Sequence, residues 1–124
     1  MRLMKRIARG REHQHLTEAF MATFIMLTRL SHGALKSPEE LEKLERKVVD
    51  RITAEIPEVE WSASYATLGP YDYVDIFQAP DVESATKVAT IVRTFGHAHT
   101  ETWAATDWQR FKEIARDILP LNEG

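Results

Sequence analysis

The amino-acid sequence predicts an α+β fold with the element order β-α-β-β-α-β and an added C-terminal helix. Three observations lead to this prediction: short apolar or alternating runs typical of strands, well-capped helix starts, and apolar residues repeating at spacings of three and four. The length of 124 residues fits one domain. Such a chain can bury most of its apolar surface without disulfides or a structural metal.

The first strand and the first helix are clearly marked. Residues 22–30 form a short apolar run, which predicts a largely buried strand. Ser37 is suited to cap a helix, Pro38 suits its first position, and Glu40 completes a capping box. The helix is expected to end at Pro57. Its apolar stripe consists of Leu41, Leu44, Val48, Ile52 and Ile56.

A hairpin and a second helix follow. Residues 59–68 and 71–78 both alternate between apolar and polar side chains, and a Gly-Pro pair separates them, so they predict a β-hairpin. Asp81 is placed to cap the second helix and Gly96 to end it. The apolar stripe of this helix consists of Val82, Ala85, Val88, Ala89, Val92 and Phe95.

Residues 97–105 predict the fourth strand, and a last helix follows it. Thr106 and Gln109 resemble a second capping box, and Pro120 ends the helix. One side of this helix carries Trp108, Phe111, Ala115, Ile118 and Leu119. The order of elements is the split-βαβ, ferredoxin-like pattern, with four strands in one antiparallel sheet and both main helices on one face.

Alternation within the strands predicts which side chains the helices cover. The small or aliphatic set is expected there: Ile25, Leu27, Val74, Ile76, Ala98, Thr100, Thr102 and Ala104. The uncovered face would then carry Phe24, Met26, Phe77 and Trp103. A large exposed apolar patch usually marks an interface, so we expect a homodimer in which two sheets face each other. Alternatively, the C-terminal helix covers this patch within one chain through Trp108 and Phe111.

The charge is unevenly placed along the chain. Residues 1–20 hold five Lys and Arg against two Glu, a net charge of +3, whereas residues 21–124 hold eleven basic and seventeen acidic side chains, a net charge of −6. An acidic main body argues against nucleic acid as a partner. Residues 1–20 are expected to be a peripheral or mobile extension. A basic arm for RNA or an acidic surface, a transit-like segment, and a start codon assigned too early are the alternatives for it.

Several classes of protein are excluded by composition. The chain has no cysteine, which excludes disulfides, thiolate zinc sites and a thiol nucleophile. No stretch approaches the roughly 20 apolar residues that span a bilayer, and no apolar run follows the N-terminal charges as a secretory signal requires. We therefore expect a cytoplasmic protein without a membrane partner. No phosphate-binding glycine loop is visible, and no cofactor is expected.

The turn of the hairpin carries a family likeness. The run Leu68-Gly69-Pro70-Tyr71-Asp72, followed by an apolar strand and Ala79-Pro80-Asp81, resembles the GYD domain family over about residues 22–117. The resemblance implies a domain over residues 21–119, followed by a tail over 120–124, and a dimeric α+β barrel. That superfamily hosts cofactor-independent monooxygenases, isomerases, haem proteins, stress-response proteins and effector-sensing modules, and fold alone does not choose among them.

The motif residues Gly69, Tyr71 and Asp72 are expected to be structural. The turn geometry needs them without any ligand, with Asp72 bonded to nearby backbone donors and Tyr71 packed over the turn.

Four ionisable side chains on the uncovered face are the candidate ligand-binding residues: Tyr73, Asp75, His99 and Glu101. They would line a pocket between the sheet and its partner, or act as general acids and bases on a small aromatic or keto substrate. A salt-bridged or hydrogen-bonded dimer network is the alternative. His97 and His99 lie about 7 Å apart along one strand and form, with a carboxylate, a weak candidate metal site. Solvent exposure of His97 and a hydrogen bond of His99 in the interface are the alternative there.

These observations lead to three hypotheses of function. The first is a homo-oligomeric module that binds or senses a small molecule. The second is a cofactor-free enzyme of the monooxygenase or isomerase kind, and the third is a structural or interaction protein, so catalysis itself stays open.

Overall fold

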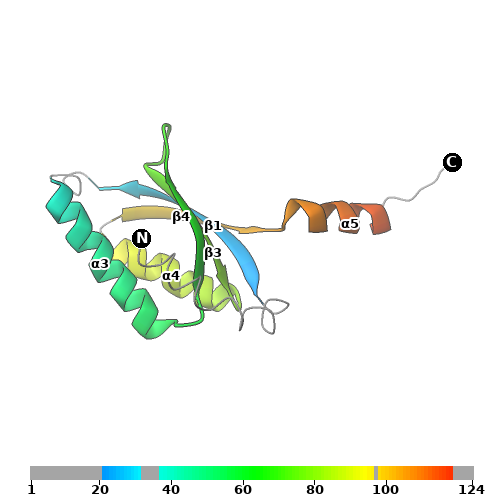
Figure 1. Ribbon diagram of the computed structural model, residues 1–124, viewed down its shortest axis with the longest axis horizontal. Helices are drawn as coiled ribbons and strands as arrows, with labels where there is room; N and C mark the ends of the chain where they lie inside the picture. Colours follow the sequence, from blue (N-terminus) through cyan, green and yellow to red (C-terminus); the bar gives the residue numbers. More distant parts are fainter. Residues whose placement is uncertain (1–20, 32–36, 97, 119–124) are drawn as a thin grey trace.

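The computed structural model describes residues 21–31, 37–96 and 98–118, and it has the predicted order of elements (Figure 1). The elements are β1 (Ala22–Leu30), α3 (Pro38–Glu55), β2 (Glu60–Ala66), β3 (Tyr73–Ala79), α4 (Val82–Phe95), β4 (Ala98–Ala105) and α5 (Trp108–Ile118). The strands form one antiparallel sheet in the order β2-β3-β1-β4, the ferredoxin-like arrangement. The predicted N-terminal extension and C-terminal tail lie outside the described residues.

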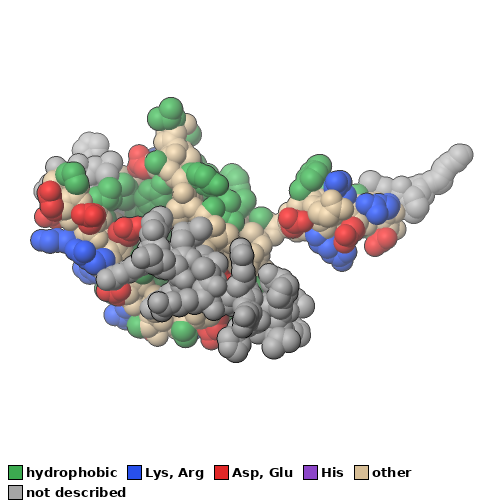
Figure 2. Space-filling view, in the orientation of Figure 1, with side chains coloured by type: hydrophobic (Ala, Val, Ile, Leu, Met, Phe, Trp, Pro, Cys, Tyr) green, Lys and Arg blue, Asp and Glu red, His purple; other side chains and the backbone are tan. Residues whose placement is uncertain are grey.

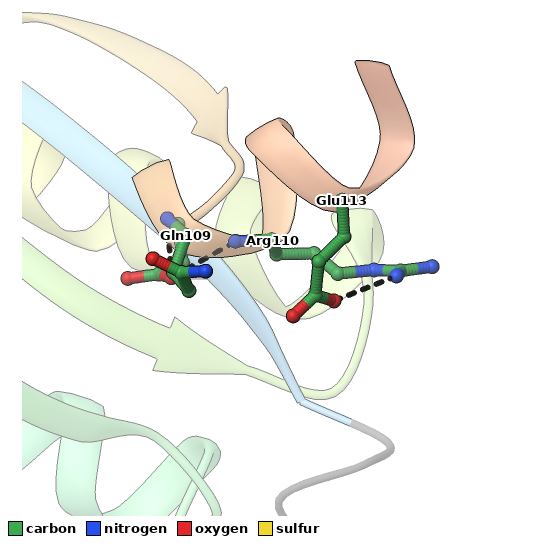
Figure 3. A network of polar contacts seen from close by, with 4 residues as sticks. Gln109, Arg110 and Glu113 are labelled. Atoms are coloured by element: carbon green, nitrogen blue, oxygen red, sulfur yellow. Dashed lines mark hydrogen bonds and ion pairs between the residues drawn. The ribbon is translucent and has the colours of Figure 1, made fainter. Parts of the chain in front are cut away.

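The helix starts confirm two of the three predicted caps. The Ser37 hydroxyl accepts from the Glu40 backbone N–H at 3.1 Å, and the Asp81 carboxylate accepts from the Ser84 N–H at 2.8 Å. Each bond satisfies a backbone donor that the helix itself leaves unpaired. At α5 the predicted capping box is wrong, because Asp107 caps this helix instead of Thr106. The Asp107 carboxylate accepts hydrogen bonds from the backbone N–H groups of Gln109 and Arg110, two residues labelled in Figure 3.

The predicted faces of the sheet are wrong for two strands. On β1 and β3 it is Phe24, Met26 and Phe77 that lie under the helices, each at most 4% exposed. Ile25 and Ile76 pair with each other and lie on the opposite face of the sheet, because neighbouring side chains alternate along a strand. On β4 the prediction is confirmed, since Thr100 and Thr102 lie opposite Thr28 and Met26 on the covered face.

The physical reason for the difference is the size of the helix residues. The side of α4 that faces the sheet is built from small side chains, including Ala85, Val88 and Ala89, all buried. Small side chains on the helix leave room for large ones on the sheet, and interiors pack to a constant density. The Phe77 ring therefore lies 5.6 Å from the Phe24 ring and 5.2 Å from the Trp61 ring, measured between centroids.

β2 contains an irregularity that changes which way its side chains point. Trp61 lies opposite Phe77, but the next paired residue, Ala63, lies opposite Ile76. Ser62 is therefore an extra residue, as in a β-bulge. After it, the alternation of β2 is shifted by one position.

α5 stands apart from the rest of the fold. Figure 1 shows it continuing beyond the end of β4, clear of the sheet and of α3 and α4. No hydrogen bond, ion pair or ring contact joins α5 to another element in the described part of the chain. The alternative in which this helix covers the sheet of its own chain is therefore wrong. None of the described helices is both long and apolar enough to cross a membrane.

Candidate functional site

A buried carboxyl group lies at the centre of the candidate site. Asp75, on β3, is 9% exposed on the helix-covered face. Its Oδ1 accepts a hydrogen bond from the Ser64 hydroxyl on β2, at 2.5 Å. The bulge at Ser62 makes this contact possible, because it turns Ser64 to the face on which Asp75 lies. Asp75 forms no salt bridge with any side chain that the structure describes.

Burial dominates the electrostatics of this cluster. Loss of solvation raises the pKa of Asp75 to about 6; the Ser64 hydrogen bond lowers it, and the charge of Glu45 on α3 raises it further. Burial, reinforced by the Asp75 charge, raises the pKa of Tyr73 to about 12, while the Thr28 hydroxyl acts in the opposite direction. Tyr73 is thus a hydrogen-bond donor at any physiological pH, and Asp75 changes protonation near neutrality.

The strand register surrounds these two residues with further polar groups. Two neighbouring rows cross the covered face of the sheet: Ser64, Asp75, Met26 and Thr102 form one, and Ala66, Tyr73, Thr28 and Thr100 form the other. Arg93 on α4 donates to the Thr100 hydroxyl at 2.9 Å and to its carbonyl at 3.0 Å. The Thr102 hydroxyl oxygen is buried and has no hydrogen-bond partner among the described residues.

A second cluster lies on the open face, the side of the sheet away from α3 and α4. Glu101, on β4, accepts hydrogen bonds from the Tyr71 hydroxyl and, at 2.8 Å, from the Trp103 indole N–H. These two bonds, the Tyr71 bond first, hold the pKa of Glu101 below its ordinary value. The Arg29 guanidinium lies 5.6 Å from the centre of the Tyr71 ring, and His99 lies opposite Arg29 in the register. Glu101 is exposed to solvent, so this cluster belongs to the surface.

The hairpin turn is fastened to β1 through Asp72. The Asp72 carboxylate accepts from the Leu30 backbone N–H at 2.7 Å, and the Asp72 N–H donates to the Thr28 carbonyl at 2.8 Å. The donor is therefore a backbone N–H of β1, 42 residues away in sequence, and not a nearby backbone donor as we expected. Gly69 has a φ of +151°, a conformation that residues with a Cβ rarely adopt. These contacts fix the turn in place without a ligand.

The four predicted site residues do not form one cluster within the chain. Tyr73 and Asp75 lie on the helix-covered face, whereas His99 and Glu101 lie on the open face, because the register places them on opposite sides of the sheet. Sequence reasoning missed Ser64, whose orientation depends on the bulge. An apolar alternation alone gives no sign of that extra residue.

Only one of the two histidines predicted as weak metal ligands lies within the described residues. His97 lies outside the described residues, and His99 is exposed on β4. Within residues 21–31, 37–96 and 98–118, no group of three or more His, Cys, Asp or Glu side chains is arranged to hold a metal ion.

Comparisons with known proteins agree with the fold. A family model described as the GYD domain matches residues 24–115. No curated protein matches the chain. An AsnC family transcriptional regulator from Agrobacterium tumefaciens has a similar structure, with a TM-score of 0.50, 16% identity, and coverage of 84% of this chain and 69% of the regulator.

Two other solved structures are similar at lower scores. A protein from Arabidopsis thaliana has a TM-score of 0.47 and 12% identity, covering 69% of this chain and 94% of its own. A dimeric ferredoxin-like protein of unknown function from Thermobifida fusca has a TM-score of 0.38 and 18% identity, covering 68% and 91%. At such identities a structural likeness concerns the fold alone.

Proposed function

The chain belongs to the GYD domain family, and from this premise we propose that it is a homo-oligomeric module that binds a small molecule. The buried carboxyl of Asp75 carries the proposal. A carboxyl group without a cationic partner is costly inside a protein, and such groups are concentrated at functional sites. Its hydrogen bond from Ser64 offsets only part of that cost.

The neighbourhood of Asp75 supports a ligand with both polar and apolar parts. Tyr73 is half-buried, so the cluster reaches the surface, and its hydroxyl can donate to an acceptor on the ligand. Thr102 supplies a buried hydroxyl without a partner in the described part of the chain. Met26 and the aromatic side chain of Phe77 line the same face. We propose a small aromatic or keto compound whose oxygen meets Asp75 and Tyr73.

Self-association through the open face is the second part of the proposal. Its centre is apolar across all four strands, with Ala63, Ile76, Ile25 and Trp103 in one row. Trp103 is 49% exposed. His99 and Glu101 lie beside this row and would contact the second copy, so the two halves of the predicted site serve different partners.

The ligand is tested by thermal unfolding of the full chain with a panel of phenol, catechol, salicylate, 2-oxobutyrate and phenylpyruvate. A compound that raises the Tm of the wild type should fail with Asp75→Asn and Tyr73→Phe. Glu101→Gln is the matched control, because it makes the same chemical change on the other side of the sheet and should respond like the wild type. Equal responses from all variants, or no responding compound, would refute the proposed ligand site.

A cofactor-free isomerase is the second candidate, and the placement of the Asp75 carboxyl on the same face as the Tyr73 hydroxyl favours it. With a pKa of about 6, Asp75 can both take and return a proton near neutral pH. The corresponding step is removal of a proton from the carbon beside a carbonyl, with return of a proton to the product. Deuterium exchange into 2-oxobutyrate in D₂O, followed by NMR, should then depend on the protein and be lost in Asp75→Asn. Exchange at the uncatalysed rate would exclude this activity for that substrate.

A further inference from the structure

α5 has an apolar side that the described part of its own chain does not cover. Trp108 is 68% exposed, Phe111 48% and Ile118 69%. The rings of Trp108 and Phe111 stack on each other with centroids 5.3 Å apart, so they form one continuous surface. Figure 2 shows the hydrophobic side chains gathered on one side of α5. Helices with such one-sided patterns normally pack against another apolar surface.

The open face of the sheet is a second apolar surface that the described residues leave uncovered. One row across it holds Ala63, Ile76, Ile25 and Trp103, and the next holds Tyr65, Val74 and Leu27. Trp103 belongs to β4 and precedes α5 by five positions, so the apolar surface of the sheet leads directly toward that of the helix.

The connection between β4 and α5 directs the helix away from its own sheet. Only Thr106 and Asp107 lie between the two elements. Asp107 is occupied as the cap, with its carboxylate accepting from Gln109 at 3.0 Å and its carbonyl from Phe111 at 2.8 Å. Figure 1 shows α5 pointing outward beyond the end of β4. The apolar side of the helix is thus accessible to a second molecule.

We propose that α5 is an exchanged arm: its apolar side packs on the open sheet face of a second copy, whose own α5 returns the contact. The proposal rests on the self-association suggested above and names the segment that performs it. One chain presents both halves of the contact, which is what a two-fold symmetric exchange requires.

Charge supports a second copy as the occupant. α5 holds three basic and two acidic side chains, a net charge of +1, whereas residues 21–107 hold eight basic and fourteen acidic side chains, a net charge of −6. Arg110 and Lys112 border the apolar side of α5, as helical spacing places them. Within this acidic body, Glu101 lies on the open face, opposite Leu27, where a positive border on the helix would be attracted to it.

A lipid surface fits α5 less well. The helix has 11 residues and carries Glu113 and Asp117 among its charges. Helices that lie on membranes are usually strongly charged on the polar side and rich in Lys and Arg there. With a net charge of +1, α5 offers little attraction to anionic lipid.

The proposal is tested by light scattering of the full chain at micromolar concentration. The wild type should have twice the monomer mass. Phe111→Glu places a charge in the helix side of the contact and Val74→Glu in the sheet side, so both should be monomers. Gln109→Glu adds the same charge on the polar side of α5 and should remain a dimer. Circular dichroism of each variant checks that the fold is retained.

The outcomes separate the exchanged arm from self-association as such. A wild-type monomer refutes both, and vesicles of phosphatidylglycerol that then bind the wild type but not Phe111→Glu would show a lipid surface as the occupant instead. A Phe111→Glu dimer combined with a Val74→Glu monomer overturns the arm and leaves the sheet-to-sheet contact.

Cross-linking gives a second measurement that does not depend on charged variants. Because the chain has no cysteine, single substitutions give unambiguous disulfides. Ile118→Cys in one preparation and Ile25→Cys in a second, differently tagged one should form a mixed disulfide after mixing and oxidation. Gln109→Cys replaces Ile118→Cys as the control and should not. Equal yields from the two pairs would contradict the exchange.

Discussion

Asp75 gives the protein an unusual dependence on pH. Its folded pKa of about 6 lies above the ordinary value of 3.8, so between these values the folded chain binds more protons than the unfolded chain. Stability therefore falls as pH rises from about 4 to about 6, and the loss is complete above that range. The shift corresponds to a loss of at most about 3 kcal/mol.

The first prediction follows from this sign. Asp75→Asn should raise the free energy of unfolding at pH 8 by about 1–3 kcal/mol and flatten its decrease between pH 4 and pH 6. Urea unfolding across that range provides the measurement. Glu101→Gln should act in the opposite direction, because its folded pKa is lowered and the ionised form is the stabilised one. A pH profile unchanged by Asp75→Asn would contradict the burial of a titrating carboxyl.

The second prediction concerns Asp72, which fastens the hairpin turn to β1. Asp72→Ala removes the acceptor of the Leu30 N–H and should lower the free energy of unfolding by about 1.5–3 kcal/mol, the usual range for hydrogen bonds to charged groups. Asp72→Asn keeps an oxygen at that position and should lose less. Urea unfolding measures the loss in each variant. Equal losses would show that the hydrogen bond from Leu30 to Asp72 does not contribute to the free energy of unfolding.

At the scale of the elements, the sequence predicted the fold well, since boundaries depend on local chemistry. Ser37, Asp81 and Gly96 act within a few residues of their position in the chain. The orientation of the strands was harder to predict. Whether Phe24 or Ile25 turns toward the helices depends on the size of residues on α4, about 60 positions away. The candidate site was divided between the two faces for the same reason.

The third prediction tests the packing of α4 with a matched pair of valines. Val88 is fully buried beneath the sheet, whereas Val82 is 69% exposed at the start of the helix. Val88→Ala should lower the free energy of unfolding by about 1.5–3 kcal/mol through lost burial and the cavity left behind. Val82→Ala should change it by less than about 0.5 kcal/mol. Equal effects measured by urea unfolding would contradict the assignment of the covered face.

At the scale of the whole molecule, the sheet separates two environments that the sequence does not distinguish. One side is closed by α3 and α4 and holds the Asp75 cluster, and the other presents an apolar surface with Glu101 at its margin. Alternation shows that a strand has two faces, but the identity of the covered face depends on everything packed against it.

The fourth prediction belongs to this scale. If folding is coupled to self-association, the Tm of the wild type should rise with protein concentration, because assembly binds only the folded state. Val74→Glu should remove this dependence while leaving the buried Asp75 cluster unaltered. Differential scanning calorimetry over a hundredfold range of concentration measures both. A Tm independent of concentration in the wild type would count against a coupled oligomer.

The extra residue in β2 has a consequence for how the chain tolerates change in length. Ser62 has no partner of its own on β3: Trp61 lies opposite Phe77 and Ala63 opposite Ile76, which are consecutive residues. Deleting Ser62 would therefore join Trp61 directly to Ala63 and give a regular strand. Ser64 would still lie opposite Asp75, and Tyr65 would stay on the open face. A deletion at Tyr65 would instead move the residues that follow it to the opposite face, so the same change in length has different effects three positions apart.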